Sequence, residues 1–103
     1  MEKYSVKMTA RALRDLDAIY EYIEYITKSI LKPETALSLV EEIETGINSL
    51  ENMPQRCPER RVGNYANKGY RQLFIHLYTV VFRIDEQDKQ VVVVTIRYSP
   101  SLF

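Results

Sequence analysis

The chain has almost none of the residues that build covalent or metal-bound frameworks: its 103 residues include one cysteine and one histidine. Cys57 has no partner for an internal disulfide bond, which suits a reducing cytoplasm. One cysteine and one histidine also fall short of the ligand set of a zinc site. We therefore expect a cytoplasmic protein that binds no metal and no cofactor.

Long apolar runs are also missing. No apolar stretch approaches the roughly 20 residues that a membrane-spanning helix needs. The opening residues, MEKYSVKMTARA, lack the apolar core of a secretion signal. What is present is 46% hydrophobic and 27% charged residues, which is ordinary for a globular domain with its own core. We expect one domain over residues 1–103 and no membrane partner.

The formal net charge is zero, but the charges are unevenly distributed. Residues 1–55 contain 6 Lys and Arg against 10 Asp and Glu, whereas residues 56–103 contain 8 against 4. The first half thus carries −4 and the second half +4. Such polarity indicates either a surface for an acidic partner or two solvated faces.

A short alternating segment opens the chain and leads into a helix. From Lys3 to Met8, apolar and polar residues alternate, which is typical of a half-buried strand. Thr9 then stands where a hydroxyl can cap a helix N-terminus. From Ala10 to about Lys28, apolar residues recur three and four apart and predict one buried stripe, formed by Leu13, Leu16, Ile19, Tyr20, Ile23 and Ile26. Tyr22 and Tyr25 widen this stripe, either at the margin of the core or in contact with a partner.

A second helix is predicted to begin at Pro33, because proline fits the first helical position. Its apolar positions are Leu37, Val40, Ile43, Ile47 and Leu50. The connection between the helices is short, so we expect them to pack as an antiparallel hairpin. Gly46 lowers helix stability by about 1 kcal/mol relative to alanine. A close crossing of the two helices would explain its presence.

The segment from Met53 to Lys68 is predicted to be a loop, because it contains two prolines, a glycine and two asparagines. Its charge is strongly positive: against the single acid Glu59 it carries Arg56, Arg60, Arg61 and Lys68. The loop is therefore either a contact surface for a partner or a solvated connection.

Three apolar runs between Tyr70 and Tyr98 predict an antiparallel meander, with a break at residues 76–77 and a charged turn at residues 85–89. Strict alternation divides the side chains of the last two runs between two faces. One face is predicted to hold Tyr78, Val80, Phe82, Ile84, Val92, Val94, Ile96 and Tyr98, and the other Thr79, Val81, Arg83, Val93, Thr95 and Arg97. The first face should lie under the helices, so that Arg83 and Arg97 point away from them.

The order of these elements predicts an α+β domain of two layers. It has an N-terminal strand, an antiparallel helical hairpin and then a three-stranded antiparallel meander. Two further residues of the meander are Arg71 and His76. Arg71 is spaced two and four residues from the apolar Leu73 and Ile75, so it falls on their side of the first strand. His76, at the break, is expected to be a turn or surface residue.

Three segments of the chain resemble the RelE/ParE toxins, which are the toxic partners in bacterial type II toxin–antitoxin pairs. They are the opening YSVKMTARALRDLDAIYEYI, the helix end SLENMP and the run GYRQLFIHLYTVVFRID. They occur in the family's order and span nearly the whole chain. The resemblance implies a RelE/ParE-like fold and a cognate antitoxin that wraps the toxin. It also implies that operator DNA is met only indirectly, through the antitoxin.

The resemblance implies two modes of action, namely inhibition of DNA gyrase in the ParE branch and ribosome-dependent cleavage of mRNA in the RelE and YoeB-like branch. In the nucleases an arginine follows the tyrosine that begins the second meander strand, and here Thr79 takes its position. YoeB-like enzymes end in arginine–tyrosine–histidine–tyrosine, but Ser99 and Pro100 replace the last two residues. We therefore favour a gyrase inhibitor that is not an enzyme. The alternatives are an mRNA endoribonuclease and an inert partner-binding protein.

The two modes of action need different residues. Cleaving RNA without a metal takes a base, an acid and cations on the phosphate. For a nuclease we expect Arg71, Arg83 and Arg97 to hold phosphate and Tyr98 to be the acid–base candidate. For binding, we expect an acidic, amphipathic segment of a partner to lie along the loop and sheet. The residues predicted for this contact with target or antitoxin are Arg56, Arg60, Arg61, Lys68, Arg83, Arg97, Tyr22 and Tyr25.

Overall fold

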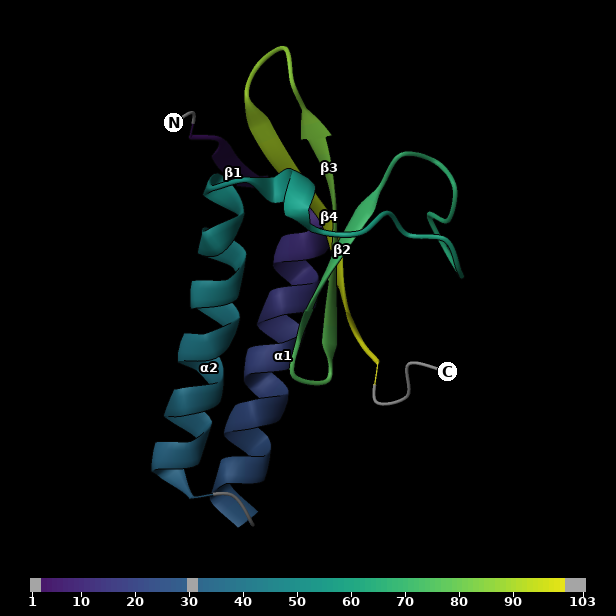
Figure 1. Cartoon of the computed structure of the whole chain (residues 1–103). Helices are drawn as coiled ribbons and strands as arrows, with labels where there is room; N and C mark the ends of the chain where they lie inside the picture. Colours follow the sequence, from purple (N-terminus) through teal and green to yellow (C-terminus); the bar gives the residue numbers. More distant parts are fainter. Residues whose placement is uncertain (1–2, 30–31, 100–103) are drawn as a thin grey trace.

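The computed structural model describes residues 3–29 and 32–99 and has the predicted two-layer α+β architecture (Figure 1). A four-stranded sheet forms one layer, and two antiparallel helices lie side by side against it. The elements in chain order are β1 (Ser5–Met8), α1 (Ala10–Ser29), α2 (Pro33–Asn48), the 3-10 helices η1 (Ser49–Glu51) and η2 (Pro54–Arg56), β2 (Arg71–Ile75), β3 (Tyr78–Asp85) and β4 (Gln90–Tyr98). Every helix and strand predicted from the sequence is present.

The sheet has the strand order β1-β4-β3-β2, in which β1 is parallel to β4 and the other pairs are antiparallel. β1 pairs only with residues Gln90–Val93 of β4. Beyond that point α1 occupies the edge of β4. The Thr9 hydroxyl donates to the Val94 carbonyl at 3.1 Å, and Asp15 accepts from the backbone N–H of Ile96 at 3.2 Å. These bonds satisfy edge groups that have no strand partner.

The strict alternation predicted for β4 is wrong because the strand contains a β-bulge. The register steps from Val93, opposite Phe82, to Thr95, opposite Val81, and leaves Val94 as an extra residue. An inserted residue reverses the alternation of the side chains before it. Val94 is therefore a bulge residue and not a core position.

The predicted core face of β4 is therefore correct on one side of the bulge and wrong on the other. After the bulge, Ile96 and Tyr98 face the helices as predicted, since they pair with core-facing residues of β3. Before the bulge, the fully buried residues are Val91 and Val93. Val92 pairs with Arg83 and lies on the opposite face.

The buried stripe of each helix is shifted by one residue near its N-terminus. Leu13 and Leu37 are predicted to be buried, but they are 51% and 60% exposed. The alanines that precede them, Ala12 and Ala36, are buried instead. A methyl side chain allows the helix to lie closer to its neighbour than a leucine would. The predicted cap at Thr9 is confirmed, because its hydroxyl accepts from the Ala12 N–H at 3.1 Å.

Gly46 is required by the sheet and not, as predicted, by a crossing of the two helices. A Cβ atom at this position would lie against the side chain of Ile75 in β2, only 2.9 Å from its Cγ1 atom. Ile75 is itself buried, so it has little room to move aside. The glycine therefore lets α2 come close to β2.

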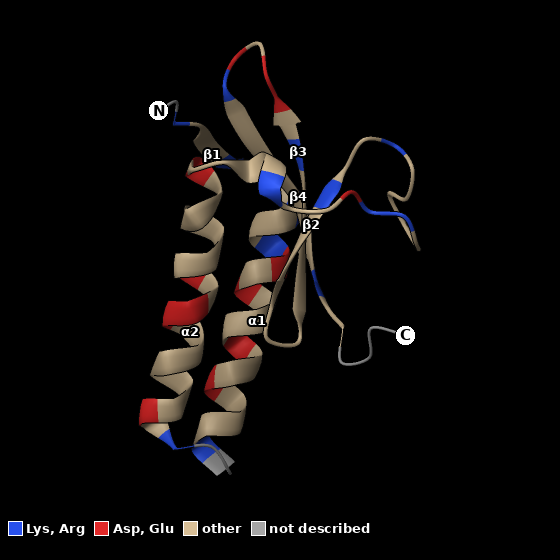
Figure 2. Ribbon diagram, in the orientation of Figure 1, with Lys and Arg blue, Asp and Glu red and all other residues tan. Residues whose placement is uncertain are grey.

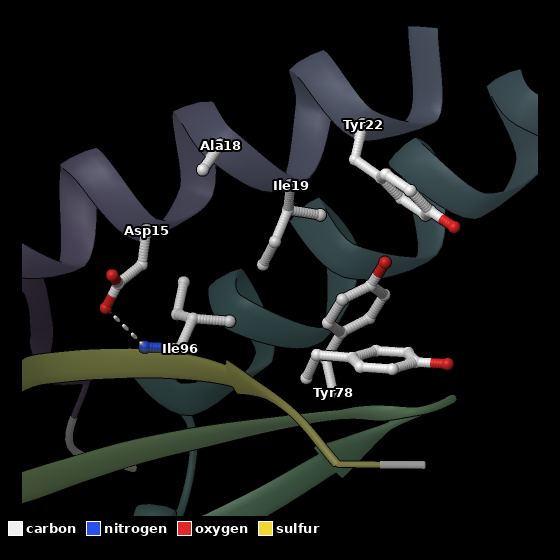
Figure 3. A pocket seen from close by; sticks show the side chains of 7 residues that line it. Asp15, Ala18, Ile19, Tyr22, Tyr78 and Ile96 are labelled. Atoms are coloured by element: carbon white, nitrogen blue, oxygen red, sulfur yellow. Dashed lines mark hydrogen bonds between the residues drawn. The ribbon is translucent and has the colours of Figure 1, made fainter. Parts of the chain in front are cut away.

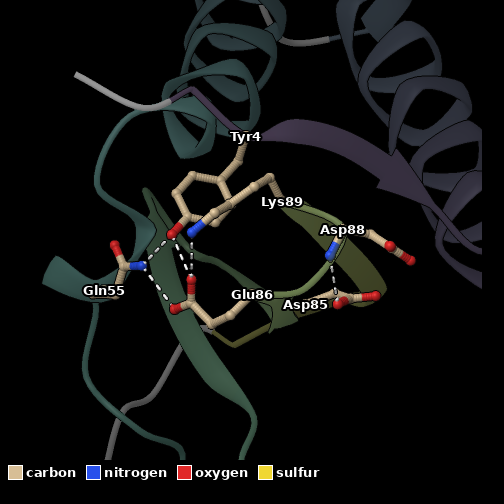
Figure 4. Close-up of polar contacts among 6 residues, drawn as sticks. All are labelled: Tyr4, Gln55, Asp85, Glu86, Asp88 and Lys89. Carbon is tan, nitrogen blue, oxygen red and sulfur yellow. Dashed lines mark hydrogen bonds and ion pairs between the residues drawn. The ribbon is translucent and has the colours of Figure 1, made fainter.

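A polar cluster joins the N-terminal segment to the β3–β4 turn (Figure 4). The Tyr4 hydroxyl donates to Glu86 at 2.7 Å, and the Gln55 amide donates to the other Glu86 oxygen at 3.0 Å. The Lys89 ammonium lies 3.5 Å from Glu86. The hydrogen bond from Tyr4, with help from Gln55, lowers the pKa of Glu86 below its usual value. The cluster thus connects three segments that are far apart in the sequence.

Candidate functional site

Two arginines of the basic loop are bonded within the chain. The Arg56 guanidinium donates to the Asn52 carbonyl at 2.7 Å, and Arg60 donates to the Asn64 carbonyl at 2.5 Å. Arg60 also donates to the side chain of Gln72 on β2 at 3.0 Å. The irregular backbone leaves carbonyls without partners, and these bonds satisfy them. Both residues, predicted to contact a partner, therefore also support the loop.

Arg71 has a comparable place at the start of β2. It donates to the carbonyl oxygens of Cys57 at 2.6 Å and of Gln55 at 3.3 Å. It pairs with Phe82, and so it belongs to the helix-facing side of the sheet. Burial raises the pKa of the Cys57 thiol, although the neighbouring arginines oppose this effect, so the thiol is neutral at neutral pH.

The other predicted loop cations, Arg61 and Lys68, are exposed to solvent. They lie in the outer part of the loop, where Val62 is 81% exposed. Tyr65 connects this part to the start of β2, because its ring packs edge-on against Tyr70 at a centroid distance of 4.9 Å. Arg61 and Lys68 are thus available to a partner on an anchored loop.

The sheet face turned away from the helices, which we call the open face, is the main candidate site. Its residues form four rows across the strands: Ser5, Gln90 and Asp85; Lys7, Val92 and Arg83; Thr95, Val81 and Gln72; and Arg97, Thr79 and Phe74. In the third row, Val81 and Thr95 are buried. Arg83 and Arg97 therefore point away from the helices, as predicted. Lys7 was missed by the sequence analysis. Its signal is its place between Val6 and Met8, out of phase with the apolar side of the first strand.

The cations of the open face have no acidic partner among residues 3–29 and 32–99. The ion pairs found there between lysine or arginine and a carboxylate join Lys3 with Glu51, Arg11 with Asp15, Lys28 with Glu24 and Lys89 with Glu86. Figure 2 shows the acids mainly on the helices and the β3–β4 turn, whereas cations lie on the sheet and loop and also near both ends of α1. Arg83 and Thr79 stand four residues apart, so the row with Arg83 and the row with Arg97 are about 13 Å apart at about 3.3 Å per residue. This spacing suits separate anionic groups along an extended chain.

A second concave surface lies on the helix-facing side, between α1, α2 and the ends of β3 and β4 (Figure 3). Two hollows of about 460 and 600 Å³ share Tyr22, Tyr78 and Tyr98, and we call them together the tyrosine groove. The rings of Tyr78 and Tyr98 are tilted by 57° with centroids 5.7 Å apart. Tyr22 is 57% and Tyr98 59% exposed, whereas Tyr78 is buried. Burial, followed by the neighbouring Tyr98 and Tyr22, raises the pKa of Tyr78, which keeps this phenol neutral.

Tyr25, the other aromatic residue predicted to contact a partner, lies one helical turn beyond Tyr22 and is 70% exposed. Neither tyrosine is part of the buried stripe of α1. Both therefore present aromatic surface to solvent on the same side of the helix.

The four residues predicted for a nuclease do not converge. Arg83 and Arg97 lie on the open face, but Tyr98 lines the tyrosine groove on the other side of the sheet. Arg71 is bonded to loop carbonyls. Thr79, at the position of the nuclease arginine, is 2% exposed. The cations of the open face thus lack the tyrosine that was expected to transfer protons beside them.

His76 lies at the β2–β3 turn, as predicted, with a left-handed backbone at φ 54°. Its Nε2 atom contacts the Glu42 carboxylate of α2, so it is turned toward the helices. Within residues 3–29 and 32–99, no group of three His, Cys, Asp or Glu side chains could hold a metal ion. None of the helices in these ranges is long and apolar enough to cross a membrane.

Several solved structures share this fold, which places the protein in the RelE/ParE-like fold class. The chromosomal ParDE system from P. aeruginosa aligns with a TM-score of 0.69 and 25% identity, over 94% of this chain and 97% of that one. The RelBE2 toxin–antitoxin complex from Mycobacterium tuberculosis gives 0.63 and 22%, over 98% and 97%. A YoeB/ParE toxin from Agrobacterium tumefaciens gives 0.58 and 20%, over 91% and 96%.

The sequence identifies the family within this class. The model of the ParE toxin of the type II toxin–antitoxin system parDE matches residues 6–100. The chain therefore belongs to the ParE toxin family and is the toxin of a type II toxin–antitoxin system. A search of curated protein sequences gave no match.

Proposed function

We propose that this toxin acts in the cytoplasm by binding DNA gyrase, without catalysis. The main support is the separation of Tyr98 from Arg83 and Arg97 by the thickness of the sheet. A metal-free nuclease needs its proton-transfer groups and its cations around one phosphate. A binding surface has no such requirement. Two rows of residues with unpaired cations are enough for electrostatic complementarity.

We further propose that a cognate antitoxin neutralises the toxin by laying an acidic, extended segment across the open face. Three features support this. Among its described residues the face carries Lys7, Arg83 and Arg97 against the single acid Asp85, its Phe74 is 44% exposed, and Arg61 and Lys68 continue the positive charge onto the loop. Two of the structural relatives are named as a toxin–antitoxin system and a toxin–antitoxin complex. The antitoxin would thus cover the cations that the toxin needs for its target.

Supercoiling by purified gyrase in the presence of the purified toxin tests the target. We expect the wild-type protein to inhibit supercoiling and the double variant Arg83→Glu/Arg97→Glu to lose this inhibition. Arg14→Glu is the matched control, because Arg14 is an exposed cation on α1. No inhibition by the wild-type protein at large molar excess would rule out gyrase.

The same double variant tests antitoxin binding. Reversing the charges of Arg83 and Arg97 should weaken the complex roughly a hundredfold, with Arg14→Glu close to wild type. An unchanged dissociation constant would mean that the antitoxin does not use the open face.

The second candidate function is ribosome-dependent cleavage of mRNA. It is favoured by the unpaired Lys7, Arg83 and Arg97, because such cations also suit the phosphates of ribosomal RNA and mRNA. Primer extension on a translated message separates the two functions. New cleavage sites in the ribosomal A site would favour the nuclease, and an uncut message together with inhibited gyrase would exclude it.

A further inference from the structure

Arg60 belongs to the basic loop, but its side chain reaches the open face. Its Nη1 atom donates to the side-chain oxygen of Gln72 at 3.0 Å. Gln72 lies in the row of the open face that contains Val81. This row stands between the row with Arg83 and the row with Arg97, and its own three residues are uncharged. The loop thus adds a cation to the middle of the face.

The loop fixes Arg60 in this place. The Arg60 N–H donates to the Tyr70 carbonyl at 2.8 Å, and the Arg60 carbonyl accepts from the Asn67 N–H at 2.9 Å. The Nε atom of the side chain donates to the Asn64 carbonyl at 2.5 Å. Gly63, with φ 78°, leaves room for the guanidinium, because a Cβ atom there would lie 3.1 Å from the Nη2 atom of Arg60. The guanidinium is therefore held in position before a partner binds, which lowers the entropic cost of binding.

The charge of Arg60 is not neutralised by these bonds. Its side-chain acceptors, the Gln72 amide oxygen and the Asn64 carbonyl, are neutral groups. Within residues 3–29 and 32–99, no ion pair joins Arg60 to a carboxylate. Val81, the neighbour of Gln72 on β3, is completely buried although it points away from the helices. Long polar side chains bury such a residue by lying over it, so the middle row has a polar and cationic cover.

With Arg60, the cations of the open face repeat at a shorter interval. Adjacent rows on one face are two residues apart, which is about 6.6 Å at about 3.3 Å per residue. Alternate side chains of an extended peptide stand at the same interval and point to the same side. Three acids at alternate positions of such a peptide therefore match the rows served by Arg83, Arg60 and Arg97.

We propose that Arg60 supplies the middle cation of the open face and thereby selects an extended peptide segment with acidic residues at three alternate positions. This inference rests on the proposed use of the open face by an acidic segment, and it adds the spacing of the acids. The outer acids pair with Arg83 and Arg97. The middle acid accepts from the Nη2 atom of Arg60, since the loop and Gln72 already occupy Nε and Nη1.

Binding of two fluorescent peptides to the full-length protein tests the proposal by anisotropy. One peptide has glutamate at three alternate positions with threonine between them, and its match has glutamine in place of the middle glutamate. We expect the wild-type protein to bind the first peptide roughly tenfold more tightly, as for a charge-assisted hydrogen bond. Arg60→Gln should bind both peptides equally. Gln72→Leu, which leaves every charge in place but removes the acceptor of Arg60, should reduce the preference.

Arg14→Gln is the matched control, because it removes the charge of an exposed arginine on α1 and should keep the tenfold preference. Arg60 is not part of the hydrophobic core, so Arg60→Gln should fold. Equal binding of the two peptides by the wild-type protein, or an undiminished preference in Arg60→Gln, would overturn this inference alone.

Two further outcomes separate this inference from the proposed function. If Arg83→Glu/Arg97→Glu bound both peptides as tightly as the wild type, or if the wild type bound neither peptide, the use of the open face by an acidic segment would fail as well. Tighter binding of a single-stranded oligonucleotide of the same charge than of the first peptide would overturn the inference in favour of a phosphate backbone. The assay contains no gyrase, so its result does not depend on the supercoiling test.

Discussion

The two faces of the sheet are made by the same strands but have different surroundings. Phe82 and Arg83 are neighbours in β3, and they point to opposite sides because side chains alternate along a strand. Phe82 is completely buried under the helices, whereas Arg83 is exposed on the open face. The covered face carries most of the stabilising burial, and the open face carries charges that the fold does not neutralise. Stability and surface charge can therefore be changed independently in one strand.

The largest expected effect tests this independence directly. Phe82→Ala should lower the free energy of unfolding by about 3–5 kcal/mol, because it removes a fully buried ring and leaves a cavity. Arg83→Ala should change it by less than about 0.5 kcal/mol, as for other exposed positions. Urea unfolding followed by circular dichroism measures both. A large loss of stability in Arg83→Ala would mean that the open face is also part of the core.

The second prediction concerns how closely the helices cover the sheet. Gly46→Ala should destabilise the fold by about 1–3 kcal/mol, since the new methyl group overlaps the side chain of Ile75. Trimming that side chain in the double variant Gly46→Ala/Ile75→Val should recover part of the loss. The same unfolding measurement applies, with Ile75→Val alone as the control. If the two substitutions were simply additive, the contact between α2 and β2 would not be the cause.

The third prediction tests the edge of β4, where the two faces meet. Asp15→Ala should cost about 1–3 kcal/mol, because the Thr95 hydroxyl and the Ile96 N–H lose their acceptor. Asp15→Asn keeps an oxygen acceptor and should cost less. Hydrogen exchange of the Ile96 amide measures the local effect. Equal protection of this amide in the wild type and in Asp15→Ala would contradict the assignment.

The smallest effect is expected in the polar cluster at the β3–β4 turn. The pKa of Glu86 is lowered from 4.5 in the folded state, so its ionised form stabilises the fold above that pH. This contribution is lost as the pH falls through the lowered pKa. Glu86→Gln should therefore lower Tm slightly at neutral pH and have no effect in acid. Thermal unfolding at several pH values measures this, and a pH-independent difference between the proteins would contradict it.

Local sequence signals predicted the elements of this fold correctly. Thr9 and Pro33 mark helix starts because capping and the fixed φ of proline act within one turn of chain. Alternation and turn residues predicted the meander for the same reason. The predicted burial of Leu13 and Leu37 is wrong because burial depends on how closely each helix approaches the sheet. That distance is set by Ala12, Ala36 and Gly46 together with residues far away in the sequence.

The candidate site was only partly predictable. Arg83 and Arg97 were correctly predicted to point away from the helices, because side chains alternate between the two faces of a strand. In β4, however, the bulge at Val94 exchanges the faces on which Val92 and Val93 lie. No local sequence pattern predicted this bulge. Lys7 joins Arg83 only because β1 pairs with β4, at the other end of the chain.

The sequence by itself determined the order of the elements, their helical or extended form, and the division of charge between its two halves. These properties depend on backbone preferences and on residue spacing within short segments. Only the tertiary structure decided which cations are free and which hold loop carbonyls, and on which side of the sheet Tyr98 lies. The physical reason is that hydrogen-bond partners and strand register are set by contacts between distant segments. The open face and the tyrosine groove are both products of those contacts.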